Sequence, residues 1–437
     1  MSQTKQQVVV IGGGFAGIAA AKVLQHHLPD GYQLTLVSEE SYTTFNPMLP
    51  EVVGASVFPE HLVAPLRQVI DIQGKANFVM ARVEKIDVKE KRITCTTLNG
   101  RVEVPYAHAI LAIGNRARID FLPGMKEFAL PLKTIGDAVH IRNEVLRRIA
   151  KIELTTDAPT REKLGHFIVL GGGFSGVEVA GAIADCLRSI TRYYPRADPK
   201  VLKVSLVHDG DRLLPELEPM LGLSAQKSLE ARQVNVLLGQ RAGSISDSGV
   251  TFTSGEMLAG GTVIATIGTQ PNSLLAEMGL PTERGRLVVN GDMSVKDVDG
   301  LWAAGDCALV PNKLDDSFSP PTAQFAVHEG KFLAHNLIKQ IQGKATVPFS
   351  YKSKGSMATV GHMKGVASVF GLKLTGLPAW LFWRAYYLSQ MPTLGRKIRI
   401  YVEWTWGMFF PVDITHFRFQ RTVEIMEEVE RDKEKIV

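Results

Sequence analysis

Two glycine-rich stretches of this chain have the residue types and spacing that bind the diphosphate of a dinucleotide. The first stretch, VVVIGGGFAGIAAA at Val8 to Ala21, places glycines at the spacing Gly-x-Gly-x-x-Gly between a β-branched run and an alanine-rich run. The first glycine permits a tight turn after a strand, the second admits a pyrophosphate to the backbone, and the third lets helix and strand pack closely. The helix N-terminus then attracts the anion. The residues expected at this turn are Gly12, Gly14, Phe15, Ala16 and Gly17.

The second stretch, FIVLGGGFSGVEVA at Phe167 to Ala180, repeats the first. Val10 to Ala21 and Val169 to Ala180 are identical at seven of twelve positions, including the run Gly-Gly-Gly-Phe and the third glycine. Gly171, Gly173 and Gly176 take the roles of Gly12, Gly14 and Gly17. Because the pattern occurs twice, the chain is expected to bind two nucleotide-bearing cofactors rather than to contain two ordinary turns.

Acidic residues follow the second strand of each predicted unit, where a ribose hydroxyl is usually bound. Glu39, just after the strand Leu34 to Val37, is preferred over Glu40 for the first unit. In the second unit His208 stands where the acid is expected, and Asp209 and Asp211 follow it, with Arg212 as a counterweight. Asp209 and Asp211 therefore favour NADH over NADPH. His208 could equally be a surface side chain beside the loop.

Three further strand-like runs end in glycine. They end at Gly114, at Gly268 and, in the run GLWAAGDCA, at Gly305 followed by Asp306. An acid in this position can accept hydrogen bonds from the ribitol of a flavin; the alternative is a helix N-cap, since a helix is expected over Pro320 to His335. Elsewhere, Ile141 to Ile152 predicts a helix and Thr155 to Gly165 a surface loop. The alternation of strands and helices predicts an α/β fold with two Rossmann-like dinucleotide-binding domains.

Composition excludes several classes of protein. The 437 residues are 45% hydrophobic with a net charge of +5 and no long block of like charges, which disfavours nucleic-acid binding. The three cysteines are widely spaced, so neither a metal site nor a disulfide framework is expected. The N-terminus leads directly into the first strand, so no signal peptide is expected. No uninterrupted apolar run is long enough for a spanning helix.

Several motifs together resemble one flavoprotein family. The two glycine turns with LWAAGDCA resemble flavoproteins with two dinucleotide-binding domains, of the glutathione-reductase-like fold, in which the first turn holds FAD and the second NAD(P)H. Within that superfamily, YTTFNPMLPEVVGA, PPTAQFAVHEGKFLAHNL and GLKLTGLPAWLFWRAYYLSQM with WTWGMFF resemble segments of the type II NADH:quinone oxidoreductases. The resemblance covers nearly the whole chain. It implies hydride transfer from NADH to FAD, then transfer of two electrons to a membrane quinone, without proton pumping.

The resemblance also implies roles for single residues. Ala323 and Gln324 match the start of the family pattern AQxAxQ, but His328 replaces its second glutamine and could both bind a quinone carbonyl and deliver a proton. Glu178 matches an acid near flavin and nicotinamide. Lys373 matches a lysine that approaches the flavin, although it could be a basic residue at a membrane edge. The implied domains are 1–118 and 291–345 for FAD, 119–290 for NADH, and 346–437 for membrane anchoring.

The C-terminal region is rich in apolar and aromatic residues. Residues 376–412 are expected to lie on a membrane surface as a peripheral anchor at the cytoplasmic face of the inner membrane. The aromatic anchors would be Trp380, Trp383, Tyr386 and Tyr387. A homodimer interface or a core helix is the alternative. Residues 398–406 fit a strand or a helix by period, and the resemblance favours a helix. The tail after Arg418 is expected to be a solvated helix.

Two other functions stay open. Disulfide-reductase chemistry is excluded because no cysteine pair follows the first unit. A sulfide:quinone oxidoreductase would use Cys186 and Cys307 to carry sulfur, but such residues are more often buried small hydrophobes. The second alternative is an NADH-binding flavoprotein that docks to a partner with little turnover. The sequence leaves open which quinone is used.

Overall fold

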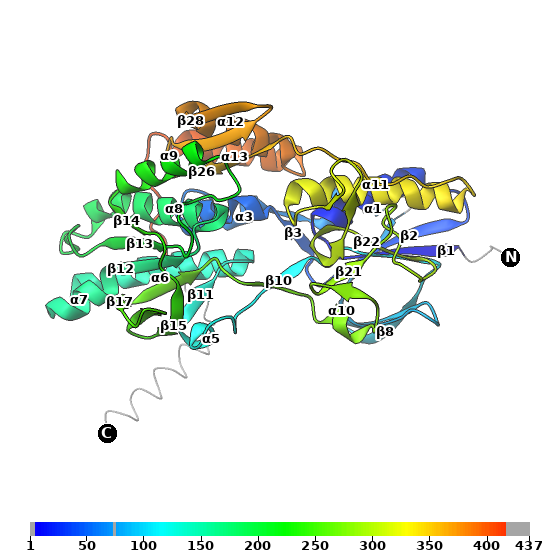
Figure 1. Ribbon diagram of the computed structural model, residues 1–437, viewed down its shortest axis with the longest axis horizontal. Helices are drawn as coiled ribbons and strands as arrows, with labels where there is room; N and C mark the ends of the chain where they lie inside the picture. The colour runs from blue at the N-terminus through cyan, green and yellow to red at the C-terminus, as the bar shows by residue number, and fades with distance from the viewer. Residues whose placement is uncertain (1–4, 73–75, 417–437) are drawn as a thin grey trace, which may run out of the picture.

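The computed structural model describes residues 5–72 and 76–416, which fold into two lobes covered by a C-terminal layer (Figure 1). The first lobe is built on a five-stranded sheet in which every neighbouring pair is parallel. In spatial order its strands are β22 (Leu301–Ala303), β9 (His108–Leu111), β1 (Gln6–Ile11), β2 (Tyr32–Ser38) and β5 (Ala76–Met80). The apolar run Val8 to Ile11 is fully buried, as expected for a parallel strand that is covered on both faces.

Helices cover one face of this sheet and a three-stranded antiparallel sheet covers the other. The helices are α1 (Phe15–His27) and α11 (Ala323–Ile341), which pack closely because Gly330 of α11 rests on the backbone of Ala16. The small sheet contains β6 (Arg82–Asp87), β7 (Arg92–Thr97) and β8 (Gly100–Pro105). Figure 1 shows α11 and β8 on opposite sides of the lobe. The alanine-rich sequence of α1 thus permits a close helix pair.

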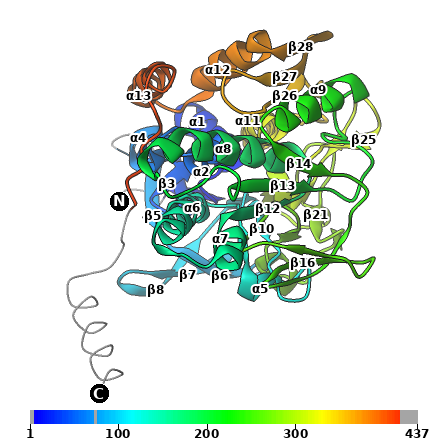
Figure 2. The same cartoon turned by 90° about the vertical axis from the view of Figure 1, so that its left-hand side faces the viewer.

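The second lobe repeats this architecture. Its parallel sheet has the order β11 (Ala129–Pro131), β18 (Thr262–Ala265), β12 (His166–Leu170), β13 (Lys203–Val207) and β14 (Val234–Leu237). Its helices are α6 (Ile135–Leu154), α8 (Phe174–Ile190) and α9 (Pro219–Glu230), and its small antiparallel sheet contains β15 (Ala242–Ser246), β16 (Gly249–Phe252) and β17 (Met257–Ala259). Figure 2 looks onto this lobe. The expected pair of Rossmann-like units is confirmed.

Two predicted elements of the second lobe are corrected. The segment predicted as a loop contains helix α7 (Ala158–Gly165), which begins where the Asp157 carboxylate accepts the N–H of Thr160 at 2.9 Å. Capping rather than apolar periodicity specifies this helix, so the pattern missed it. Helix α6 begins six residues before the predicted start because Thr134 and Asp137 form a capping box.

Segments cross between the lobes at two places. Strands β10 (Asn115–Ala117) and β19 (Thr269–Pro271) form an antiparallel pair at the crossing. Leu274 and Leu287 then pack in the same core as Val8, so the chain rejoins the first lobe before residue 290. In the opposite direction, helix α2 (Leu49–Val53) packs in the core of the second lobe, with Gly54 against Ala182 of α8.

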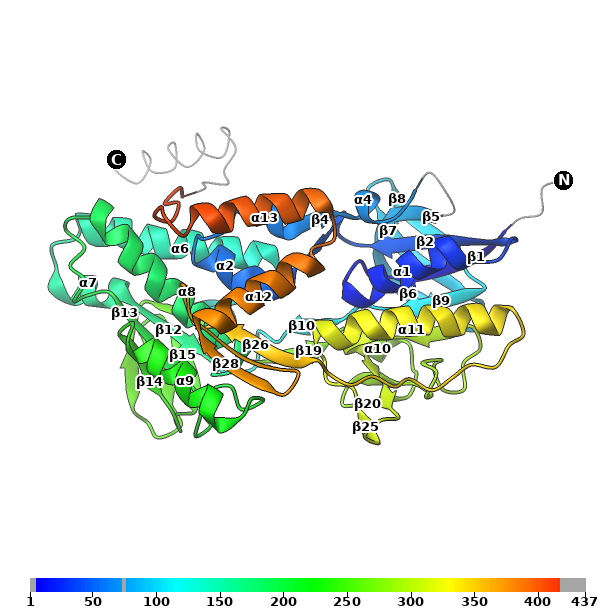
Figure 3. The ribbon, with the colours of Figure 1, turned by 90° about the horizontal axis from the view of Figure 1, so that it is seen from above.

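The C-terminal layer lies on the second lobe and reaches the junction with the first lobe, as Figure 3 shows from above. It contains the antiparallel strands β26 (Gly355–Thr359), β27 (Gly365–Val369) and β28 (Leu372–Gly376), then α12 (Leu377–Gln390) and α13 (Leu394–Trp406). The ambiguous residues 398–406 are helical. Within the described ranges, no helix has the length and apolar character needed to cross a membrane. The prediction for the tail after Arg418 lies outside the described residues.

Candidate functional site

The first glycine turn has the geometry of a phosphate cradle. Gly12 has a φ of +113°, and a Cβ at Gly12 or Gly17 would collide with the backbone of Ala112 or Gly12 respectively. Gly14 differs, because an added Cβ would meet no atom within 4 Å. Gly14 is the N-cap of α1 and supplies no side-chain cap. Open space therefore lies at the start of a helix, where Phe15 and Ala16 begin the first turn and an anion is favoured.

The second turn reproduces this geometry. Gly171 has the same φ of +113°, and a Cβ on Gly176 would collide with the carbonyl oxygen of Gly171. At Gly173 an added Cβ would meet only the Glu216 Oε1 atom, at 3.7 Å. Gly173 is the N-cap of α8, again without a side-chain cap. The chain thus carries two equivalent open helix N-termini, one in each lobe.

The predicted ribose acids lie at the ends of the second strands. Glu39 follows β2, is exposed, and lies 3.9 Å from the Arg116 guanidinium. Asp209 follows β13, is exposed, and its Oδ1 lies 3.5 Å from His208 Nδ1. The His208 ring packs against Gly172, where an added Cβ would meet it at 2.6 Å. His208 therefore fills the turn itself, and Asp209 is the carboxylate that remains available to a ligand.

Asp306 lies in the turn η3 (Gly305–Cys307) that follows β22. Burial raises the pKa of its carboxyl, while Lys133 and Arg286 oppose that shift. No hydrogen bond to the Asp306 carboxylate occurs among the described residues. A half-buried acid that lacks donors suits a ligand with hydroxyl groups. Of the other predicted glycines, Gly114 and Gly268 have φ of +60° and +79° at the crossing between the lobes.

Two charged residues near this turn were missed by the sequence analysis. Glu329 of α11 is 2% exposed, and its Oε2 accepts the Gly305 N–H at 2.7 Å, which fixes the turn that carries Asp306. Burial raises the Glu329 pKa to about 7. Lys133 donates to Asn115 Oδ1 at the crossing between the lobes, and burial lowers its pKa. Both hydrogen bonds join separate segments of the chain, so no local pattern predicts them. The one signal in the sequence was that Glu329 is an acid on the face of α11 that is buried.

The start of α11 holds Ala323, Gln324 and His328. Gln324 Oε1 accepts the Ser353 hydroxyl at 3.0 Å and the Lys354 N–H at 3.3 Å, so it binds the chain that leads to β26. The His328 ring stacks on Tyr351 with centroids 3.9 Å apart. Burial, Lys331 and Lys354 lower the His328 pKa. The ring is therefore neutral at neutral pH, and proton delivery by His328 stays a prediction.

Glu178 of α8 is a buried acid. Its Oε1 accepts the Thr359 N–H at 3.0 Å, and burial raises its pKa to about 8. The carboxyl therefore holds a proton at neutral pH. Tyr387 of α12 lies nearby, and burial together with Glu178 raises the pKa of its phenol. The Trp383 ring packs edge-on against Tyr387 with centroids 4.5 Å apart. These residues form a polar centre within an aromatic cluster.

Two predicted membrane anchors are corrected. Trp380 and Trp383 are 2% and 1% exposed, so neither can lie in a lipid headgroup region. The apolar pattern of α12 identified residues that must be covered, but it could not say whether protein or lipid covers them. Arg384 is also held within the protein, with its guanidinium 3.6 Å from the Trp380 ring centroid. Within the C-terminal layer, the exposed apolar side chains lie mainly on α13 and the segment after it.

Lys373 of β28 is placed on the second lobe. Its Nζ lies 3.8 Å from Glu218 Oε1 at the start of α9, and within residues 5–72 and 76–416 no hydrogen bond or ion pair joins Lys373 to Glu178. The approach of Lys373 to a flavin stays a prediction.

A cavity of about 880 Å³ lies between α8, α2, the turn after β26 and the C-terminal helices. Glu178 lines it from α8. Exposed apolar side chains occur along its C-terminal wall, notably those of Val402, Trp406 and Phe409. The cavity thus connects a buried acid with an apolar surface.

The described residues contain neither a reactive thiol nor a metal-binding cluster. Cys186 and Cys307 are buried, and burial raises the pKa of each thiol to about 12, so neither is available as a sulfur carrier. Across residues 5–72 and 76–416, no cluster of three or more His, Cys, Asp or Glu side chains could hold a metal.

Comparisons with known proteins agree with this architecture. Residues 6–330 match the model of the pyridine nucleotide-disulphide oxidoreductase family. Over 426 residues the chain is 30% identical to the type II NADH:quinone oxidoreductase NdhA of Mycobacterium tuberculosis, covering 93% of this chain and 87% of that protein. It is 25% identical over 480 residues to the mitochondrial external alternative NADH-ubiquinone oxidoreductase of Yarrowia lipolytica, covering 94% and 81% of the two chains.

A solved structure has the same fold. NDH2 from Plasmodium falciparum, in complex with NADH, superposes with a TM-score of 0.86 at 20% identity, covering 94% of this chain and 100% of that chain.

Proposed function

Because the chain belongs to the pyridine nucleotide-disulphide oxidoreductase family, we propose that it is an FAD-dependent, non-proton-pumping NADH:quinone oxidoreductase. Its full-length relatives among the type II NADH:quinone oxidoreductases support this proposal. The overall reaction is NADH + H⁺ + quinone → NAD⁺ + quinol. The observation that carries the proposal is the pair of open helix N-termini at Gly14 and Gly173, one in each lobe. Two such turns support two dinucleotides in one chain.

The first turn is assigned to FAD. The open space at Gly14 fits the diphosphate, Glu39 would accept a ribose hydroxyl, and Asp306 would accept from the ribitol chain. A bound flavin would accept a hydride and pass two electrons to the quinone. The protein supplies orientation here, because Glu329 fixes the Gly305 backbone and thereby the position of Asp306.

The second turn is assigned to NADH. Gly173 admits the diphosphate at the start of α8, and Asp209 would accept the 2′-hydroxyl of the adenosine ribose. The same carboxylate would repel the 2′-phosphate of NADPH. The helix that begins at Gly173 also carries Glu178, one turn further along, so the nucleotide turn and the buried acid share one rigid element.

Quinone reduction is assigned to the region between Glu178 and the C-terminal helices. Glu178 holds a proton at neutral pH and can give it to a quinone oxygen, with Tyr387 beside it. We propose Gln324 and His328, at the start of α11, as further polar contacts for the quinone, on the basis of the family resemblance. Lys373 of β28, whose Nζ lies 3.8 Å from Glu218 Oε1, is proposed from the resemblance as a basic residue that approaches the flavin.

We place the enzyme peripherally on the cytoplasmic face of the inner membrane, through residues 376–412. The exposed apolar side chains of α13 and the following segment support this attachment. The test of function is NADH oxidation by the purified flavin-loaded protein with a soluble quinone in excess. Rapid NADH loss that depends on quinone supports the proposal, and bound flavin with no such turnover favours an NADH-binding flavoprotein that docks to a partner.

A further inference from the structure

The turn that follows β26 is bound to α8 at two acidic residues. The Thr359 N–H donates to Glu178 Oε1, and the His362 N–H donates to Asp185 Oδ2. Glu178 and Asp185 are seven residues apart, which is about two helical turns, so they lie on one face of α8. The turn therefore follows α8 from a buried acid to a more accessible one.

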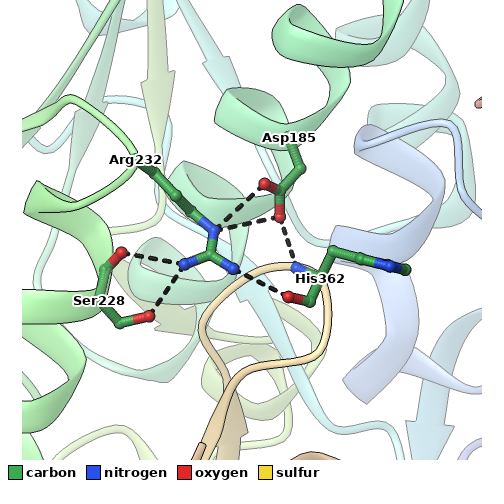
Figure 4. A network of polar contacts seen from close by, with 4 residues as sticks. All are labelled: Asp185, Ser228, Arg232 and His362. Atoms are coloured by element: carbon green, nitrogen blue, oxygen red, sulfur yellow. Dashed lines mark hydrogen bonds and ion pairs between the residues drawn. The ribbon is translucent and has the colours of Figure 1, made fainter. Parts of the chain in front are cut away.

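Arg232, just beyond α9, fixes this turn from the other side (Figure 4). Its Nε lies 3.1 Å from Asp185 Oδ1, and a terminal nitrogen donates to the His362 carbonyl oxygen at 2.9 Å. A second terminal nitrogen donates to Ser228 Oγ at 3.0 Å. Both backbone groups of His362 are thus held, one by Asp185 and one by Arg232. These hydrogen bonds involve charged side chains that are largely shielded from solvent. They therefore hold the backbone of His362 in one position.

The imidazole of His362 is not part of that network. Figure 4 shows it pointing away from the Arg232 guanidinium. The side chain is exposed, yet it lines the same 880 Å³ cavity as Glu178, with its ring centroid 6.0 Å from that of Trp380. The charged groups that face it are Asp185 of α8, Arg232, Arg384 of α12 and Glu51 of α2. Partial desolvation of the ring, which is in part accessible to solvent, lowers its pKa, so the ring is a neutral proton acceptor at neutral pH.

The proposed reaction needs such a group. Each turnover consumes one proton from solvent in addition to the hydride of NADH. Once Glu178 has given its proton to a quinone oxygen, its buried carboxylate must be protonated again. A cavity of this volume is large enough for water to connect its mouth with Glu178.

We propose that His362 takes up this proton from solvent and returns it through the cavity to Glu178, and that Asp185 and Arg232 are the positioning residues that hold His362 at the cavity. This inference rests on the proposed quinone reduction. In the transfer, one imidazole nitrogen gains a proton from water and the ring releases a proton towards the Glu178 carboxylate, so no electrons move and the ring returns to its neutral form.

The test measures two half-reactions of the flavin-loaded protein separately. His362→Gln should slow reoxidation of the reduced flavin by a soluble quinone by about tenfold or more at pH 8, with a smaller effect at pH 6 where protons are abundant. Added imidazole should restore the rate. Anaerobic reduction of the flavin by NADH should change by less than about twofold. The control is His140→Gln, which replaces an exposed histidine of α6 outside this cavity.

Arg232→Gln tests the positioning role. It should reproduce the slow, pH-dependent reoxidation and should also respond to imidazole, which a general loss of folding would not. A reoxidation pH profile of His362→Gln identical to that of the unmodified protein overturns the inference. If the unmodified protein does not pass electrons to quinone, the proposed function is wrong and the inference is wrong with it. A normal rate in the unmodified protein and an unaltered pH profile in His362→Gln would overturn the inference alone.

Discussion

The buried carboxylate of Glu178 accepts the backbone N–H of Thr359 at 3.0 Å, which joins the helix after the second glycine turn to a strand 181 residues further along the chain. This contact brings the C-terminal layer onto the second lobe at the acid proposed to supply a proton. The acid therefore serves both as a contact between parts of the fold and as a proton-holding group, and each role can be measured.

Glu178→Gln should change how stability depends on pH. The carboxyl has a pKa of about 8 in the folded protein, above its ordinary value of 4.5. Between these values the folded state binds the extra proton, so its free energy of unfolding falls as pH rises. The glutamine variant keeps an acceptor for Thr359 but has no such dependence. Its unfolding free energy relative to the unmodified protein should therefore rise between about pH 5 and about pH 8, by roughly 1.4 kcal/mol per pH unit at most.

Denaturant titrations at both pH values provide the measurement. Glu277→Gln, which changes an exposed carboxylate, is the control and should show a flat difference. A flat difference for Glu178→Gln as well would mean that Glu178 is ionised at neutral pH in the folded protein.

Gly173→Ala and Gly176→Ala should separate cofactor binding from folding. At Gly173 a methyl group fits the protein but occupies the space assigned to the NADH diphosphate, so NADH affinity should fall by about tenfold, or roughly 1.4 kcal/mol, with little loss of stability. At Gly176 the methyl group collides with the Gly171 carbonyl, so the unfolding temperature itself should fall.

Calorimetry of NADH binding and thermal melts distinguish these effects. Gly395→Ala, where an added Cβ meets nothing within 4 Å, is the matched control. Unchanged NADH affinity in Gly173→Ala would remove the second turn from the NADH site.

His328→Gln should have little effect on quinone reduction. The ring stacks on Tyr351, and glutamine can replace its hydrogen bonding to a quinone. The proton is proposed to pass through Glu178 and His362, so the loss of the His328 imidazole should not block it. We expect quinone-dependent turnover within about threefold of the unmodified protein from pH 7 to pH 8, well short of the loss expected for a general acid. A loss of a hundredfold at these pH values would show that His328 is protonated during turnover.

Ile398→Ser combined with Trp406→Ser should weaken membrane attachment. Both side chains lie on α13 and are 56% and 60% exposed. Since burial of a large apolar side chain contributes roughly 1.5–3 kcal/mol, the double variant should bind anionic lipid vesicles at least about tenfold more weakly in sedimentation assays. Leu98→Ser, at an exposed position between β7 and β8, is the control. Unchanged vesicle binding with loss of a dimer in ultracentrifugation would instead make this face a homodimer interface.

The sequence predicts those parts of the fold that are determined by residues close together in the chain. The glycine spacing at Gly12 and Gly171 specifies a turn that the backbone adopts almost identically in both lobes, and apolar runs such as Val8 to Ile11 specify buried parallel strands. Helix α7 was missed because a cap at Asp157, not an apolar face, defines it.

Contacts between distant segments could not be predicted from the same patterns. The hydrogen bond of Glu329 to Gly305 depends on how α11 lies against the first sheet, and the burial of Trp383 depends in part on Trp404 of α13, which packs against it. The family pattern that predicts Lys373 near a flavin says nothing of its protein neighbours, whereas the pairing of β28 with β27 brings its Nζ within 3.8 Å of Glu218 Oε1. Charge and apolarity indicate that a side chain needs a partner, but only the fold determines which partner it meets.

The most direct test of the proposed function follows the flavin absorbance of the purified protein under anaerobic conditions. NADH is added first, NADPH is compared, and a soluble quinone is then supplied. We predict bleaching by NADH, much slower bleaching by NADPH because of Asp209, and full return of the oxidised spectrum with quinone. Flavin that stays oxidised with NADH, or reduced flavin that quinone does not reoxidise, would contradict the account.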